Sequence, residues 1–215
     1  LAHVFGLKPE NVRVVSPFVG GGFGGKVALW SHTVLCAAAA KLAGRPVKLA
    51  LSREGVFRLV GGRTLAEQRV ALGADANGAL TALIHTGTTA TTTHARYPEQ
   101  LSLTSRHVYA TTNLRSGQDV VNLDTVANTW MRAPGDALAT YALEVAIDEL
   151  AVAMQLDPIE LRRRNEPTQD PTTGAPFSSR HLLECFAQGA EVFGWARRPP
   201  EPRSRRPRCD APGAP

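Results

Sequence analysis

The glycine-rich segment from Gly20 to Gly25 constrains this 215-residue chain more than any other feature. Five of its six positions are glycine, and Lys26 follows directly. Glycine adopts positive φ angles and lets a ligand approach the backbone closely. Before the segment, a short apolar run at 12–18 predicts a strand. After it, the Ala- and Leu-rich stretch 27–43, ended by Gly44, predicts a buried helix that contains Cys36.

The first turn of such a helix would offer unpaired N–H groups to an anion, so an anionic cofactor is predicted at the glycine segment. The simpler alternative is a flexible, tightly packed turn. The pattern G-x-G-x-x-G fits Gly20, Gly22 and Gly25, but a glycine run matches many templates, and a dinucleotide-binding fold also needs an acid about 20 residues on. Glu54 comes later than that. A P-loop is less favoured still, because Val27 replaces the required hydroxyl residue.

Further along, periodicity and turn residues predict a strand-rich middle and a helical end. Strands are predicted where β-branched residues gather: 47–51, 68–72 and 79–93, the last two joined by a turn at 75–78. Residues 95–130 predict short strands and loops. Helices are predicted at 137–154, after the capping residue Asp157, and from Ser178 or Ser179 to Phe193. Strands followed by helices indicate an α+β fold with mixed sheets and packed helices.

The net charge of +5 is concentrated at the C-terminal end. Six arginines against two acids, Glu201 and Asp210, give this end +4 and leave +1 for the rest. The arginines are Arg197, Arg198, Arg203, Arg205, Arg206 and Arg208. A nearly neutral body does not indicate a nucleic-acid surface. The Pro- and Arg-rich stretch 197–215 is instead typical of disorder.

Cysteine and histidine spacing argues against a metal site made by this chain alone. Cys36, Cys185 and Cys209 are far apart and odd in number, which favours neither a metal pair nor a disulfide framework. A reducing, cytoplasmic compartment is favoured, and a periplasmic one stays open. The histidines show no ligand spacing, although the roles of His94 and His107 stay open. No apolar run reaches the roughly 20 residues that span a bilayer.

A second segment, Thr129–Gly135, would by itself predict only a Pro-Gly turn before a helix. In order, however, Val19–Lys26 and Met131–Gly135 resemble the glycine loop and the second cofactor segment of the molybdenum-binding subunits of the xanthine dehydrogenase/aldehyde oxidase family. The resemblance extends from about Val4 to Arg203. Its further motifs are Ala142–Glu144, Asp148–Leu150, Asp157–Pro158, Glu160–Arg162, Asn165, Pro176–Leu182 and Phe193–Trp195.

The resemblance implies that residues 1–196 form part of a molybdenum-cofactor-binding domain, closest to the bacterial aldehyde-oxidoreductase type. Enzymes of this family hydroxylate aldehydes or N-heterocycles with oxygen from water. They use molybdenum held by molybdopterin, of which the cytosine dinucleotide is one form. The implied partners are iron–sulfur and FAD-containing subunits or domains and the remainder of the large subunit, and a homo-oligomer is expected.

The resemblance also implies roles for individual residues. The backbone of Gly22, Phe23 and Gly24 is implied to donate hydrogen bonds to an oxygen ligand of molybdenum. Arg132 is implied to bind the cofactor, through its backbone more than its side chain.

Three differences from the purine-oxidising members of the family narrow the range of expected substrates. They are Val27 in place of a glutamate, Gln100 in place of an arginine by rough alignment, and Pro134 in place of a phenylalanine. Because a purine needs polar recognition of its ring edges, we expect an aldehyde, and less readily an N-heterocycle.

The family's general-base glutamate lies in a Gly-x-Gly-Glu segment that does not occur in this sequence. No catalytic residue is therefore predicted, and we expect the chain to be inactive alone. Because it starts at Leu1 and loses the resemblance after Arg203, we expect an internal fragment with a frame shift near Ser204; a disordered tail is the alternative. The other functional alternatives are a nicotinamide-dependent oxidoreductase and a decayed product without function.

Overall fold

A computed structural model describes residues 1–199, which form an α+β fold as the sequence predicts. The strands are β1 (Ala66–Ala74), β2 (Leu80–Thr91) and β3 (Asn113–Asn122). The α-helices are α1 (Ala2–Phe5), α2 (Ser31–Ala43), α3 (Arg53–Leu59), α4 (Asp136–Ala153), α5 (Pro158–Arg164) and α6 (Leu182–Phe193). Three short 3₁₀ helices are η1 (Pro9–Asn11), η2 (Thr104–Arg106) and η3 (Trp195–Arg197).

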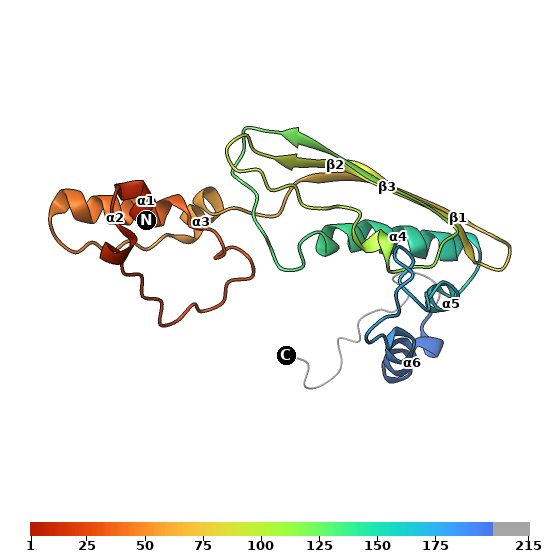
Figure 1. The fold of residues 1–215 in the computed structure, drawn as a ribbon. Helices are drawn as coiled ribbons and strands as arrows, with labels where there is room; N and C mark the ends of the chain where they lie inside the picture. The colour runs from red at the N-terminus through yellow and green to blue at the C-terminus, as the bar shows by residue number, and fades with distance from the viewer. Residues whose placement is uncertain (200–215) are drawn as a thin grey trace.

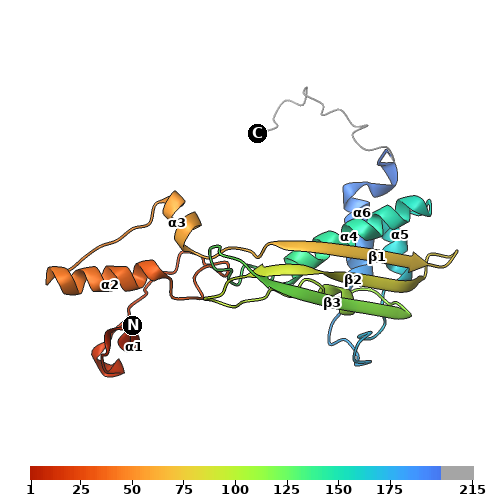
Figure 2. The ribbon, with the colours of Figure 1, turned by 90° about the horizontal axis from the view of Figure 1, so that it is seen from above.

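The three strands form one mixed sheet in the order β1-β2-β3 (Figure 2). β1 and β2 are antiparallel and joined by the predicted tight turn, in which the Asp75 carboxylate accepts hydrogen bonds from the N–H groups of Asn77 and Ala79, both at 2.9 Å. β3 runs parallel to β2, so the chain must cross from one end of the sheet to the other between them. The crossing segment, residues 92–112, contains η2 and also Glu99, which supports the functional site described in the next subsection.

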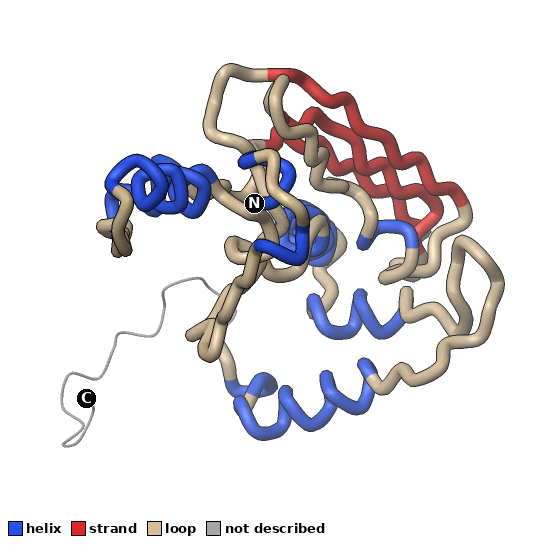
Figure 3. Tube along the Cα trace, turned by 60° about the vertical axis from the view of Figure 1, so that its left-hand side comes forward, coloured by secondary structure: helices blue, strands red, loops and turns tan. Residues whose placement is uncertain are grey.

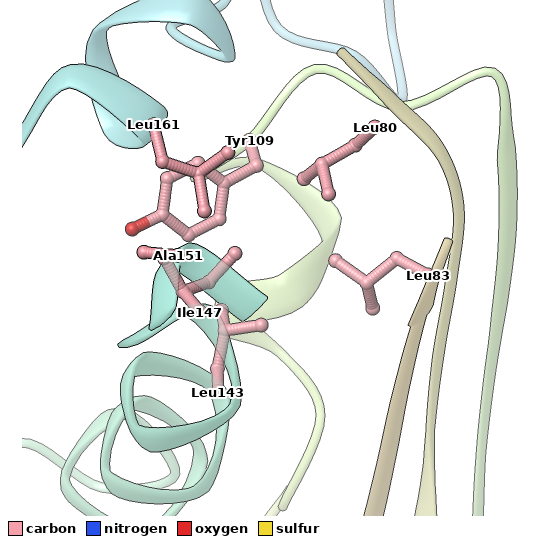
Figure 4. Packing of buried hydrophobic residues seen from close by; sticks show 7 residues of the cluster. All are labelled: Leu80, Leu83, Tyr109, Leu143, Ile147, Ala151 and Leu161. Carbon is pink, nitrogen blue, oxygen red and sulfur yellow. The ribbon is translucent and has the colours of Figure 1, made fainter. Parts of the chain in front are cut away.

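Helix α4 packs against the sheet, with α5 and α6 farther from it (Figures 1 and 3). Leu143, Ile147 and Ala151 recur every four residues, so they share one helical face, and all three are buried. They meet Leu83 of β2 and the aromatic ring of Tyr109 in the core (Figure 4). This contact between helix and sheet is the centre of the hydrophobic core.

Two polar side chains fix the helices that follow. Asp157 caps α5 as predicted, accepting from the N–H groups of Ile159 at 2.9 Å and Glu160 at 3.3 Å. Asn165, buried at the end of α5, accepts from the N–H of Leu80 and donates to the carbonyls of Gly78 and Leu161, each at 2.8 Å. The end of α5 is thereby tied to the β1–β2 hairpin.

The N-terminal segment has no comparable core. Helices α1, α2 and α3 lie beyond one end of the sheet (Figures 1 and 2), and none contains a buried residue. The prediction that α2 is buried is therefore wrong for the described residues, and Cys36 is only half-buried.

Two predicted strands, 12–18 and 47–51, are also wrong. Both stretches are irregular, because no neighbouring strand pairs with them, and Phe18 is 91% exposed. Helix α6 begins at Leu182 rather than at Ser178 or Ser179, although it ends at Phe193 as predicted.

Residues 200–215, with most of the predicted Pro/Arg-rich tail, Cys209 and the expected frame shift near Ser204, lie outside the described residues. The domain limits at 196 and 197 stay predictions. Within residues 1–199, no helix is long and apolar enough to cross a membrane.

Candidate functional site

The glycine loop uses backbone conformations that favour glycine. Gly20, Gly21 and Gly24 have φ angles of 65°, 88° and 102°, and Phe23 is also left-handed at 49°. The N–H of Gly25 donates to the carbonyl of Gly22 at 2.9 Å, which closes a turn around Phe23 and Gly24. A side chain at most of these glycines would be strained, so the loop's path depends on its composition.

The loop does not lead straight into a helix. Helix α2 begins at Ser31, not at Val27 as predicted, because residues 27–30 form an irregular turn held by Trp30. The Trp30 indole donates to the carbonyl of Gly25 at 2.6 Å, and the Lys26 ammonium donates to the carbonyl of Val19. The first turn of α2 therefore does not follow the loop directly, although His32 and Thr33 of that turn line the same cavity as the loop.

The backbone N–H groups of Gly22, Phe23 and Gly24 make no hydrogen bond within residues 1–199, and they end a longer run without such bonds that begins at Arg13. The loop is partly open to solvent, so these groups are not stranded in an apolar interior. Adjacent free donors are the groups that bind anions or oxygen ligands. They are also the three residues that the resemblance assigns to the cofactor.

The second predicted segment lies directly against this loop. The N–H of Arg132 donates to the carbonyl of Phe23 at 2.7 Å. A Cβ added to Gly24 would lie 1.9 Å from the Trp130 carbonyl oxygen, so only glycine permits this approach. Two segments more than 100 residues apart in the sequence therefore form one site. The Arg132 side chain is exposed, and within residues 1–199 only the backbone of Arg132 makes hydrogen bonds.

The second segment also has an unusual backbone. Ala133 has a φ of 57°, and Gly135 has a φ of 79°. A left-handed conformation at a residue other than glycine costs roughly 1–2 kcal/mol, so the surrounding contacts must hold it.

An ion pair holds this turn. The Arg63 guanidinium donates to the Arg132 carbonyl at 2.6 Å and to the Ala133 carbonyl at 3.2 Å. It also pairs with the carboxylate of Glu99, whose side chain is completely buried. The same carboxylate accepts from the N–H of Gly135 at 2.9 Å.

Two half-buried side-chain amides hold the backbone next to the pair. The Gln118 amide donates to the Glu99 carbonyl at 3.1 Å, and that of Asn128 donates to the Tyr97 carbonyl at 3.2 Å. The Tyr97 ring lies 4.7 Å from that of Trp130. Burial raises the pKa of the Tyr97 hydroxyl, and the negative charge of Glu99 adds to the effect while Arg63 opposes it.

A wide cavity of about 1320 Å³ opens beside the glycine loop. Its walls come from the loop, the first turn of α2, helix α3, residues 61–65 and residues 125–131. His32 lines the cavity, and its Nδ1 atom is shielded from solvent without a partner in residues 1–199; the Thr129 hydroxyl is in the same condition. Buried polar atoms in folded proteins usually have a hydrogen-bond partner, so these two atoms are available to a bound group.

The three predicted substrate residues are not gathered at this cavity. Val27 is 68% exposed on the glycine loop, and Pro134 is exposed beside Arg132. Gln100 lines a separate, smaller cavity of about 310 Å³, although its carbonyl lies against Gly135. His94 is exposed and His107 is half-buried, and neither position decides its role.

The sequence alone did not indicate a role for Arg63 or Glu99 at the site. Each stands alone among residues without periodicity, and 36 positions separate them, so no local pattern connects them. Within the described residues, no group of three His, Cys, Asp or Glu side chains could hold a metal ion.

The family model of the molybdopterin cofactor-binding domain matches residues 1–166. The chain belongs to the molybdopterin cofactor-binding domain family. This confirms the predicted resemblance and fold class, and both cofactor segments lie inside the matched range. The family match argues against a nicotinamide-binding turn, and so does the structure. Such a turn needs a strand directly before the loop and a helix directly after it. Neither is present.

Known members resemble the chain over most of its length. The aldehyde oxidoreductase molybdenum-binding subunit PaoC of Escherichia coli K12 is 40% identical over 199 residues, which cover 92% of this chain and 27% of that protein. The xanthine dehydrogenase molybdenum-binding subunit of E. coli O157:H7 is 32% identical, with 87% of this chain and 26% of that protein covered.

The aldehyde oxidoreductase structure from Desulfovibrio gigas superimposes with a TM-score of 0.75 at 26% identity, covering 91% of this chain and 22% of that one. The chain thus spans about a quarter of the length of these molybdopterin-domain relatives.

Proposed function

We propose that this chain provides the glycine loop and the second cofactor segment of a molybdenum hydroxylase that oxidises an aldehyde. The observation that carries the proposal is the direct contact between the two segments. The Arg132 N–H bonds to the Phe23 carbonyl, and Gly24 has no room for a side chain beside Trp130.

The residues present suit an oxygen-rich, anionic cofactor. The free N–H groups of Gly22, Phe23 and Gly24 can donate to oxygen atoms of the bound group, and the His32 nitrogen lacks a partner in the adjacent cavity. When bound, molybdenum–molybdopterin supplies the two-electron oxidation, with water as the source of oxygen. The chain's own share is to bind and orient this group through fixed backbone donors.

An aldehyde substrate is supported by two observations. PaoC, at 40% identity, is named as an aldehyde oxidoreductase subunit, whereas the xanthine dehydrogenase subunit is 32% identical. Val27 and Pro134 also offer no polar group that could recognise a purine edge.

The remaining parts of the enzyme are proposed to come from other sequence. The general-base glutamate is absent from this chain. The exposed apolar residues of the N-terminal segment, such as Phe18 at 91% and Leu42 at 90%, are typical of a surface covered by further protein. We propose that the rest of a large subunit covers it, with iron–sulfur and FAD partners receiving the electrons, in a cytoplasmic homo-oligomer. The cytosine dinucleotide is the proposed form of the pterin.

The test is to produce the chain alone and as part of a complete large subunit with its partner subunits, in a host that makes the cofactor. We expect the complete assembly to contain molybdenum and pterin, measured by mass spectrometry and pterin fluorescence, and to oxidise benzaldehyde much faster than xanthine. The chain alone should show no turnover. An assembly with no molybdenum would refute the cofactor proposal, and faster oxidation of xanthine would refute the substrate.

A further inference from the structure

We propose that Arg63 and Glu99 form a positioning pair that fixes the strained turn of the second segment, so that this turn holds the glycine loop in shape. The inference deepens the proposed function and rests on it for the cofactor, but the geometry that it explains belongs to the chain itself. Neither residue needs to touch the cofactor; both act through the backbone of residues 132–135.

The turn needs to be held in place because its backbone is strained at Ala133, which is not a glycine. Ala133 is left-handed at 57°, and Gly135 follows at 79°. Residues 132–134 are exposed, so this part of the turn would relax to ordinary backbone angles unless it were held at several points. The Arg63 guanidinium holds the carbonyls of Arg132 and Ala133, and the Glu99 carboxylate holds the N–H of Gly135.

The chemistry of the pair suits this task. A guanidinium presents several donors in a fixed plane, so one side chain can bind two carbonyls and a carboxylate together. Glu99 has no exposed side-chain surface, whereas 29% of Arg63 is exposed, so the carboxylate is the fixed end of the pair. Its second oxygen accepts from the N–H of Thr64 at 3.4 Å, next to Arg63 in the chain.

The backbone next to Arg63 is itself bonded to the start of the second segment. Gly62 bridges to Asn128, and the N–H of Thr129 donates to the Gly62 carbonyl at 3.1 Å. A Cβ on Gly61 would lie 2.4 Å from the Ala127 carbonyl, so these chains are in close contact. Arg63 is therefore positioned by the same segment that it holds. The hydrogen bond between Arg132 and Phe23 links the turn and the pair to the glycine loop.

The test uses Arg63→Lys and Glu99→Gln, with Glu166→Gln as a matched control. Glu166 pairs with Arg180, which also donates to a backbone carbonyl, that of Val108, at 3.0 Å. That pair is partly buried and stabilises the other end of the molecule. A lysine keeps the charge at position 63 but lacks the wide planar fork of donors with which the guanidinium reaches two carbonyls and a carboxylate.

The readout is amide hydrogen exchange of Arg132 and Gly135 in the complete assembly, resolved by mass spectrometry. Because the two substitutions weaken the charged hydrogen bonds that hold this turn, we expect exchange at the two amides to rise about tenfold or more in both variants. Amides of the core helix α4 should be unaffected. The control should leave Arg132 and Gly135 at the wild-type rate.

Two results would overturn the inference: unchanged exchange at both amides, or a uniform rise over the whole molecule, which would mean that the pair only stabilises the fold. Molybdenum content is measured on the same samples. Wild-type protein without molybdenum would refute the proposed function and leave the exchange result valid. Full molybdenum retention in variants with a loosened turn would refute the link between the turn and the cofactor.

Discussion

Replacing Gly24 with alanine should separate the two cofactor segments without unfolding the protein. The added Cβ would lie 1.9 Å from the Trp130 carbonyl oxygen, and ordinary van der Waals contact begins at 3.4 Å. One backbone must therefore move by about 1.5 Å, the difference between these two distances. The hydrogen bond from the Arg132 N–H to the Phe23 carbonyl, now 2.7 Å long, cannot survive a shift of that size.

The magnitude follows from two contributions. A left-handed alanine costs roughly 1–2 kcal/mol, and losing the hydrogen bond costs about 1 kcal/mol more. Together they weaken the cofactor-binding conformation by about 2–3 kcal/mol, which corresponds to roughly 30- to 150-fold in retention of the cofactor. The melting temperature should change little, because the glycine loop lies outside the core formed by β2, α4 and α5.

The chain offers a matched control for this experiment in Gly20. Its φ of 65° is also left-handed, but a Cβ there meets nothing within 4 Å. Gly20→Ala therefore imposes backbone strain without the collision.

The assay measures the molybdenum content per protein of the complete assembly after extensive dialysis, together with the melting temperature of both variants. We expect Gly24→Ala to retain several-fold less molybdenum than Gly20→Ala, because both carry the backbone strain but only Gly24→Ala also loses the hydrogen bond between Arg132 and Phe23. Equal retention in the two variants would show that the contact with Trp130 does not shape the cofactor site.

Three further changes test the fold and its pH dependence. Leu143→Ala in the core should lower the free energy of unfolding by about 2–5 kcal/mol in urea titrations, because the side chain is completely buried; a loss below about 1 kcal/mol would contradict the packing. Asn165→Ala should cost about 3 kcal/mol in the same assay, since it leaves the Leu80 N–H and two carbonyls without partners; a neutral result would mean that water replaces the amide. Burial lowers the pKa of His85 below 6.5, so the unfolded chain binds a proton more readily than the folded one, and stability should fall as the pH drops below about 6.5. His85→Gln should flatten this slope while the exposed control His94→Gln keeps it, and equal slopes would assign the pH dependence to other groups.

Sequence patterns predicted the parts of the fold that are fixed by local chemistry. The hairpin turn at 75–78 and the start of α5 depend on Asp75 and Asp157, whose side chains accept backbone hydrogen bonds within a few residues. Helix α4 was predicted from apolar residues at helical spacing, but the face chosen, which includes Tyr141 and Val145, is exposed, and the buried face is instead that of Ala139, Leu143, Ile147 and Ala151. In each case the structure is decided by interactions between residues that are close together in the sequence.

Patterns failed where a distant partner decides the structure. The stretches 12–18 and 47–51 have strand composition, but in residues 1–199 no strand pairs with them. Strand β3 was not resolved within 95–130, because its parallel pairing with β2 depends on a long crossing segment rather than on a tight turn. At the site, the glycine loop was evident from composition, whereas the pairing of Arg63 with Glu99 depends on the folded path of the chain.

The three-stranded sheet has a consequence for handling the isolated polypeptide. Within the described residues, β3 pairs only with β2, so its outer edge presents unpaired backbone groups. Leu114, Val120 and Val121 on this strand are between 39% and 45% exposed. Open, partly apolar edges recruit strands from other molecules and promote aggregation, although the charges of Arg115 and Asp119 interrupt this edge. Concentrated solutions of the isolated polypeptide should therefore form intermolecular β-structure at this edge before the helices unfold.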